Sequence, residues 1–273
     1  MNNKLLHFKC KITIFIFDSG VGGISVYSQI KKIFPEIHFI YLLDNKFFPY
    51  GIKSKNYIYK RCVKILKKIS YHYYISLAII ACNTASVSSI PIIQNYFSFP
   101  IIGVTPVIKD SINITNNGVI GIIATKTTLE NYYVKNKIED FRQNCIIEVL
   151  SSQELVFLSE KKIQGLNISL KKIKKIFQPW YNLKIFPDTI ILGCTHFPLI
   201  LDELKKILPK NIKFLDSSIY ILSKIKKIIT KNKFLFNTQK NIILYTKYTV
   251  KIKKIKKYLI SQGFNFFKKI KIN

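Results

Sequence analysis

The chain has 273 residues, 48% of them hydrophobic and 14% aromatic, and carries 44 Lys and Arg against 14 Asp and Glu for a net charge of +30. This composition excludes an intrinsically disordered chain, and no run approaches the ~20 apolar residues that a membrane span requires. The length is closer to two ordinary domains than to one.

Short apolar runs, each ended by small or polar residues, recur along the chain and predict buried parallel strands. They cover residues 12–17, 38–43, 77–81, 101–104, 118–124, 189–192 and 213–215. Lys-rich stretches of helical spacing lie between them, at 53–69, 166–177 and 199–208. This alternation predicts an α/β fold with ligands bound beyond the carboxyl ends of the strands.

Two of the expected strand ends resemble each other, since LAIIACNT at 77–84 and DTIILGCTH at 188–196 each place a Cys just past an apolar strand. A second pair, IFIFDSG at 14–20 and KFLDSS at 213–218, places Asp-Ser there. We therefore expect two similar lobes, each a mostly parallel sheet flanked by helices, with the active site in the cleft between them. The expected boundaries give a first lobe of residues 1–100 plus 214–273 and a second lobe of residues 101–213.

The five cysteines are Cys10, Cys62, Cys82, Cys145 and Cys194, and they contain no C-x-x-C pair. Neither a disulfide framework nor a zinc site is indicated, so we expect no metal and a reducing, cytoplasmic setting. A lone buried Cys is most often a small hydrophobe. The matched surroundings of Cys82 and Cys194 favour a functional role for both, whereas the other three lack such surroundings.

Two facing thiols can act as an acid and a base. A free thiol has a pKa near ~8.5, so a modest shift makes one a base at neutral pH while its partner keeps its proton. A base on one face of a carbon and an acid on the other invert that carbon, which for an amino acid is racemisation.

Polar groups that can bind a substrate follow other expected strands. Asp18 and Ser19 precede a Gly-rich helix entry whose main-chain N–H groups can approach an anion, although the segment matches no nucleotide-binding fingerprint. Tyr50 and Gly51 follow a Pro in a tight turn, which can present the Tyr and a main-chain N–H to a carboxylate or can be a simple surface turn.

Four further side chains each allow two interpretations, and of these Glu160, Thr125 and Thr128 are the weaker candidates. His196 can relay protons for Cys194 or be an ordinary half-buried His. Glu160 can present an acid beside the cleft or be solvated. Thr125 and Thr128, three apart at an expected helix start, can cap that helix or bind a substrate carboxylate.

Four ordered segments together resemble the signature segments of bacterial glutamate racemase: FDSGVGG at 17–23, LDNKFFPYG at 43–51, ACNTA at 81–85 and LGCTHFPL at 192–199. The resemblance extends over residues 12–218 and more weakly over 241–270. Segments 121–130, 151–165 and 178–180 are similar to the enterobacterial branch of that family.

The resemblance implies interconversion of L- and D-glutamate without pyridoxal phosphate or metal, supplying D-glutamate for peptidoglycan, and in this branch activation by a cell-wall precursor. It implies that Cys82 handles the D-glutamate proton and Cys194 the L-glutamate proton, assisted by Asp18 and His196. Glu160 matches an acidic cleft position of the branch. The positions that match substrate-binding residues are Asp18, Ser19, Tyr50, Gly51, Asn83, Thr84, Thr195 and His196. The sequence departs from the family at Ser218, where glycine is usual, and at Thr105, where apolar residues are common.

Three alternatives remain from the residues. Aspartate racemases share the two-thiol plan. The +30 charge suggests a protein that binds nucleic acid or a membrane surface. The lysines are dispersed along the chain, however, as drift toward residues with A/T-rich codons would place them. We therefore expect no specific nucleic acid or membrane partner and only weak, salt-sensitive attraction to polyanions. A Cys/His hydrolase using Cys194 and His196 would leave Cys82 unexplained.

Overall fold

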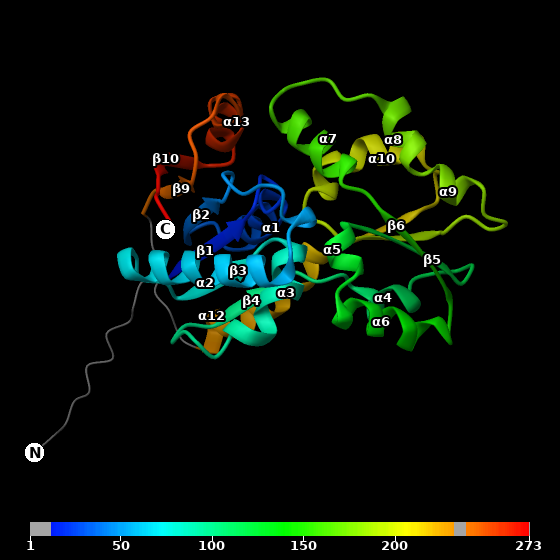
Figure 1. The fold of residues 1–273 in the computed structure, drawn as a ribbon, viewed down its shortest axis with the longest axis horizontal. Coiled ribbons are helices and arrows are strands. Elements are labelled where there is room, and N and C mark those ends of the chain that lie inside the picture. Colours follow the sequence, from blue (N-terminus) through cyan, green and yellow to red (C-terminus); the bar gives the residue numbers. More distant parts are fainter. Residues whose placement is uncertain (1–11, 232–238, 273) are drawn as a thin grey trace, which may run out of the picture.

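The computed structural model describes residues 12–231 and 239–272, and Cys10 lies outside them. Two parallel sheets form the framework (Figure 1). The first lobe contains a six-stranded sheet in the order β10-β9-β2-β1-β3-β4, and the second a four-stranded sheet in the order β6-β5-β7-β8. The strands of the first sheet are β1 (Thr13–Asp18), β2 (His38–Leu43), β3 (Leu77–Ile80), β4 (Ile101–Gly103), β9 (Asn241–Tyr245) and β10 (Phe264–Lys269). Those of the second are β5 (Val119–Ala124), β6 (Ile146–Ser151), β7 (Thr189–Leu192) and β8 (Lys213–Asp216).

Helices cover both faces of each sheet, which confirms the predicted two-lobe α/β fold (Figure 1). The first sheet is covered by α1 (Ile24–Ile33), α12 (Leu222–Lys231) and α13 (Val250–Ser261) on one face and by α2 (Lys55–His72) and α3 (Asn83–Ile93) on the other. The second is covered by α7 (Glu154–Ile163), α8 (Leu170–Ile176), α9 (Gln178–Tyr181) and α10 (Leu201–Ile207) on one face and by α4 (Ile108–Ile112) and α6 (Tyr132–Arg142) on the other. Short elements complete the fold: η1 (Tyr50–Ile52), α5 (Lys126–Leu129), η2 (Phe197–Ile200) and α11 (Ser217–Tyr220).

The core follows from the two-residue period of the strands. In β1, Ile14 and Ile16 pack into the cluster beneath α1, α12 and α13, whereas Phe15 and Phe17 pack into the cluster beneath α2 and α3. Because both faces are covered, the strand is apolar at successive positions, which is the pattern from which it was predicted. Each such side chain contributes about 1.5–3 kcal/mol when it is fully buried.

The chain crosses between the lobes twice. Strand β4 pairs in parallel with β3 of the first sheet, and β8 pairs in parallel with β7 of the second. The first crossing therefore follows Gly103 and the second follows Asp216, a few residues beyond the expected boundaries. We propose these two positions as the lobe boundaries.

Three strands, β6, β9 and β10, were not among the predicted runs. In β6 only Ile147 is buried, and in β10 only Phe264 is buried. Both strands lie at sheet edges, where mixed polar and apolar residues replace the continuous apolar run of a central strand. None of the helices in the described part of the chain is long and apolar enough to cross a bilayer.

Candidate active site

The carboxyl ends of the central strands supply the site residues. Asp18 ends β1, Cys82 lies two residues past β3, Thr125 follows β5 and Cys194 lies two residues past β7. Since β1 neighbours β3 and β5 neighbours β7, each lobe brings two of these ends together at the edge where parallel sheets bind ligands.

The two cysteines belong to opposite lobes. Cys82 packs into the first lobe's core beside α2 and α3, and Cys194 packs into the second lobe's core beside α7 and α10. Each is buried to 7% exposure and neither forms a disulfide. Burial, followed by the charges of Asp18 and Cys194, raises the pKa of Cys82 well above its usual range. The thiols are therefore within electrostatic reach of each other.

Asp18 ties the Gly-rich turn to the second lobe. Its Oδ2 accepts hydrogen bonds from the main-chain N–H of Gly23 at 2.5 Å and from Thr195 Oγ1 at 3.2 Å. Its Oδ1 accepts from Ser19 Oγ at 3.2 Å and from Gly20 N–H at 3.3 Å. Burial raises the pKa of Asp18, against the opposing effect of His196.

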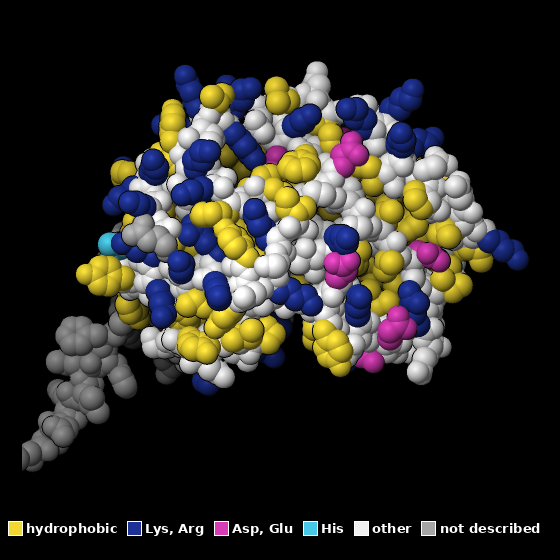
Figure 2. Space-filling model, viewed as in Figure 1, with side chains coloured by type: hydrophobic (Ala, Val, Ile, Leu, Met, Phe, Trp, Pro, Cys, Tyr) yellow, Lys and Arg dark blue, Asp and Glu magenta, His cyan; other side chains and the backbone are white. Residues whose placement is uncertain are grey.

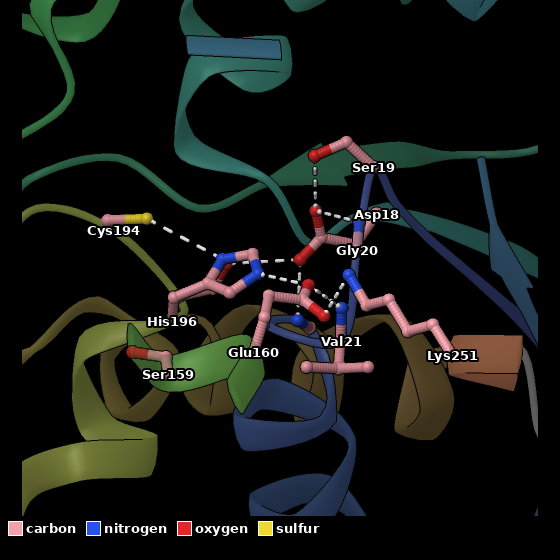
Figure 3. Close-up of polar contacts among 12 residues, drawn as sticks. Asp18, Ser19, Gly20, Val21, Ser159, Glu160, Cys194, His196 and Lys251 are labelled. Carbon is pink, nitrogen blue, oxygen red and sulfur yellow. Dashed lines mark hydrogen bonds and ion pairs between the residues drawn. The ribbon is translucent and has the colours of Figure 1, made fainter. Parts of the chain in front are cut away.

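His196 lies between Cys194 and Glu160 (Figure 3). Its Nδ1 is 3.7 Å from Cys194 Sγ, and its Nε2 is 2.8 Å from Glu160 Oε1. The same Glu160 oxygen accepts the N–H of Val21 at 2.9 Å, across the lobe boundary. A Cβ at position 20 or 22 would clash with Glu160 or His196, so glycine is required at both positions for this close approach.

The ion pair of His196 and Glu160 shifts the pKa values of both residues. Burial lowers the pKa of His196, but hydrogen bonds to Cys194 and Glu160 outweigh burial and raise it from 6.5 to about 10. Burial raises the pKa of Glu160, but the hydrogen bond and charge of His196, with those of Lys251, lower it from 4.5 to about 2. At neutral pH the site therefore holds an imidazolium beside Cys194.

Replacing His196 by asparagine is expected to lower thermal stability most between pH 4.5 and 6.5. His196 contributes stability that is complete below its unfolded-state pKa of 6.5 and is lost as pH rises through about 10. Glu160 contributes stability that is complete above 4.5 and is lost as pH falls through about 2. Melting temperatures of the two proteins over roughly pH 4 to 10 check this, and a pH-independent difference would contradict it.

Three threonines join the lobes beside Cys82. Thr84 Oγ1 lies 2.9 Å from Thr125 Oγ1 and 3.1 Å from Thr128 Oγ1, and the latter two are 2.9 Å apart. Thr125 is the N-cap residue of α5, but its side chain caps no helix N–H. The sequence offered two roles for Thr125 and Thr128, capping the helix or binding a substrate carboxylate. The structure does not show capping by Thr125.

The turn at Tyr50 is built on a buried network. The Tyr50 hydroxyl donates to Asp44 Oδ2 at 2.6 Å, and Arg61 donates to both Asp44 oxygens at 2.9 and 2.8 Å. Because the hydroxyl is engaged, only the main chain of this turn remains to contact a carboxylate. The Gly51 carbonyl accepts from Thr127 Oγ1 at 2.7 Å, which fixes the turn against the second lobe.

Two buried amides have no hydrogen-bond partner within the part of the chain that the structure describes. One belongs to Asn83, 2% exposed and adjacent to Cys82. The other belongs to Gln153, which packs against Gly51. A buried unpaired amide costs about 1–3 kcal/mol, so such groups mark positions where a polar ligand binds. Sequence reasoning singled out Asn83 but not Gln153, because only the fold shows that Gln153 is enclosed.

The structure brings the predicted residues together at one edge of each lobe. Cys62 lies on α2 in the same core cluster as Cys82, and Cys145 packs with the cluster beneath α4 and α6. Within residues 12–231 and 239–272, no group of three or more His, Cys, Asp or Glu is arranged to hold a metal ion. The fold and this pair of strand-end thiols define a class of racemases, and residues 21–220 match the family Asp/Glu/Hydantoin racemase.

The particular family follows from individual relatives. Glutamate racemase of Buchnera aphidicola subsp. Schizaphis graminum is 44% identical over 95% of this chain and 100% of its own length. The crystal structure of Escherichia coli glutamate racemase in complex with L-glutamate and the activator UDP-MurNAc-Ala has a TM-score of 0.92 and 38% identity, covering 96% of this chain and 99% of that one. The Francisella tularensis glutamate racemase in complex with D-glutamate has a TM-score of 0.79 and 25% identity, covering 96% and 98%. The chain belongs to the glutamate racemase family, which confirms the resemblance seen in the sequence.

Proposed function

We propose that this chain interconverts L- and D-glutamate in the cytoplasm through two cysteine thiols, without a cofactor, and so supplies D-glutamate for peptidoglycan. The observation that carries the mechanism is the placement of Cys82 and Cys194 at strand ends of opposite lobes, where hydrogen bonds of Thr195 to Asp18 and between Thr84 and Thr125 join the two lobes. A substrate α-carbon held between them presents one face to each sulfur.

The surroundings of the two sulfur atoms differ, which gives them different resting roles. The imidazolium of His196 places positive charge beside Cys194, with Nδ1 3.7 Å from its sulfur. Cys82 keeps its proton because burial and the Asp18 carboxylate raise its pKa. With L-glutamate, Cys194 is the base that takes the α-proton and Cys82 is the acid that returns a proton to the opposite face, and with D-glutamate the two thiols exchange these roles.

Substrate binding is assigned to groups around the thiols. The side-chain amide of Asn83 is free to pair with a substrate carboxylate, since it has no other partner among the described residues. The hydroxyls of Ser19, Thr84 and Thr195, with the main chain at Tyr50 and Gly51, surround the same strand ends. Thr125 and Thr128 are assigned to holding Thr84 in place.

Proton exchange in D₂O tests the function. The protein is incubated with L-glutamate, D-glutamate or L-aspartate, and deuterium at the α-carbon and the enantiomer formed are measured. We expect both glutamates to yield the opposite enantiomer labelled at the α-carbon. Turnover of aspartate alone would overturn the substrate assignment and favour the aspartate racemase alternative.

A second proposal concerns regulation. A cavity of ≈ 370 Å³ lies where the chain crosses between the lobes, and the Ser217 hydroxyl beside it is buried without a partner among the described residues. Its lining includes Lys109, Lys137 and Lys224, with two tyrosines. This chemistry suits an anionic ligand with a flat ring, and we propose that a cell-wall precursor of the kind bound by the Escherichia coli relative binds here as an activator.

Replacing Lys224 by alanine is expected to abolish activation by UDP-MurNAc-Ala while leaving activity without activator unchanged. Lys224 lies on α12, outside the residues around the thiols, so its loss removes a charge from this cavity and from the neighbouring one at Ile90 without touching the thiols. Racemisation rates at increasing UDP-MurNAc-Ala measure the effect. Lys64→Ala, in a separate basic cavity beside α2, is the control. Equal activation of both variants would contradict the assignment.

The +30 charge supports no competing function. Lys and Arg side chains are scattered over the whole visible face of the molecule, with apolar and uncharged groups between them (Figure 2). We propose that they produce only weak association with polyanions, which salt disrupts.

A further inference from the structure

Lys251 reaches the active site from a distant part of the chain. It is the second residue of α13, which packs on the first sheet, and its Nζ lies 2.5 Å from Glu160 Oε2 on α7 of the second lobe. Figure 3 shows the side chain extended toward Glu160. Lys251 is 26% exposed and Glu160 only 3%, so the ion pair leads from the surface into the buried site.

The two oxygens of Glu160 have separate partners. Oε1 accepts from His196 and from the N–H of Val21, whereas Oε2 pairs with Lys251. A carboxylate held at both oxygens cannot rotate about its terminal bond without breaking one of these contacts. Lys251 therefore determines how Glu160 is presented to His196, and it does so through the carboxylate.

Phe48 supports this arrangement. The Lys251 Nζ lies 4.3 Å from the centroid of the Phe48 ring, and the same ring contacts the imidazole of His196 at a centroid separation of 6.0 Å. A cation over an aromatic face is attracted by about 0.5–2 kcal/mol, according to how far it is desolvated. The Phe48 ring thus contacts both the Lys251 ammonium and the His196 imidazole.

The two catalytic thiols are not equally connected to this chain of contacts. Lys251, Glu160, His196 and Cys194 are linked in sequence by distances of 2.5, 2.8 and 3.7 Å. The pKa of Cys82 is raised first by its own burial and then by the Asp18 carboxylate. A change at Lys251 should therefore act on the Cys194 side of the site.

We propose that Lys251 is a positioning residue that orients the Glu160 carboxylate, and through it His196, for proton transfer at Cys194 and not at Cys82. The proposal rests on the racemase function proposed above. It makes helix α13 part of the catalytic apparatus, because the Lys251 side chain reaches from α13 to Glu160 of the second lobe and completes the ion pair beside His196.

The test compares Lys251→Met with Lys251→Arg and with Lys254→Met, an exposed lysine on the same helix. We expect Lys251→Met to lower kcat/KM for glutamate roughly 10- to 100-fold, as a small misplacement of a catalytic group does. Arg at 251 should restore most of the activity, since it keeps the charge, and Lys254→Met should behave as the wild type. Lys251→Gln replaces Lys251→Met if the latter does not fold.

The decisive measurement is the isotope effect with α-deuterated L- and D-glutamate. If only the Cys194 step is slowed, the isotope effect rises for the enantiomer whose proton Cys194 removes and falls for the other. Wild-type kcat/KM in Lys251→Met, or a loss of activity with both isotope effects unchanged, would overturn the proposal. Failure of the wild type to exchange the α-proton of either glutamate would instead overturn the proposed function.

Discussion

Replacing Cys82 or Cys194 by serine is expected to lower racemisation of glutamate by about 10²- to 10⁴-fold in both directions, the range typical of losing a general acid or base. Serine keeps the shape of the side chain, but its hydroxyl is a far weaker acid than a thiol and cannot act as the base at neutral pH. Both directions suffer because each needs one group to take a proton and the other to supply one. Rates from L- and from D-glutamate, measured for each variant, check this.

Cys145→Ser is the matched control, because Cys145 is partly exposed and packs with the cluster beneath α4 and α6, away from the site. It should retain wild-type rates. A Cys82→Ser variant with nearly full activity would contradict the two-thiol mechanism and revive the Cys194–His196 hydrolase alternative. Melting temperatures of all three variants establish that lost activity is not lost folding.

Replacing Arg61 by methionine is expected to destabilise the fold by about 3–5 kcal/mol, the cost of leaving a buried charge without its partner. Asp44 is 0% exposed and receives two hydrogen bonds from Arg61, which donates a third to the Ile272 carbonyl. For a chain of this size such a loss lowers the melting temperature by roughly 6–20 °C. Thermal unfolding followed by circular dichroism measures it.

Two further variants test whether the loss of stability in Arg61→Met comes from the buried ion pair. Lys60→Met, at the exposed neighbouring position, should change stability by no more than about 0.5 kcal/mol. The double variant Arg61→Met with Asp44→Asn should be more stable than Arg61→Met alone, because it removes the uncompensated charge. If the melting temperature of Arg61→Met equals that of Lys60→Met, the buried ion pair of Arg61 and Asp44 does not stabilise the turn at Tyr50.

Most interior strands could be predicted because they are buried on both faces, although β9, between β10 and β2, was missed. The strands β1 and β7 are buried at every position and, apart from Thr13, Asp18 and Thr189, consist of apolar residues. The edge strands β6 and β10 could not be predicted this way, since solvent on one side permits Glu148 in one and Lys268 in the other. Their pairing is decided by the neighbouring strand.

The two thiols proposed to be catalytic could also be predicted from the sequence. Cys82 and Cys194 each follow an apolar run directly, and parallel strands bring their carboxyl ends to one edge. Local sequence thus places both thiols at a ligand-binding edge, and the repeated setting separates them from Cys62 and Cys145. The ordered motifs then indicated glutamate as the substrate.

What the amino-acid sequence determined by itself was the position of the seven predicted strands and the residues that follow them, because burial and strand period act over a few neighbouring positions. Only the tertiary structure decided that Lys251 pairs with Glu160, that Asp44 takes the Tyr50 hydroxyl, and that Gln153 is enclosed. The contact of Lys251 with Glu160 joins residues that are 91 positions apart in the chain and belong to different lobes. Such contacts depend on how the two lobes dock, and no periodicity within either segment encodes that geometry.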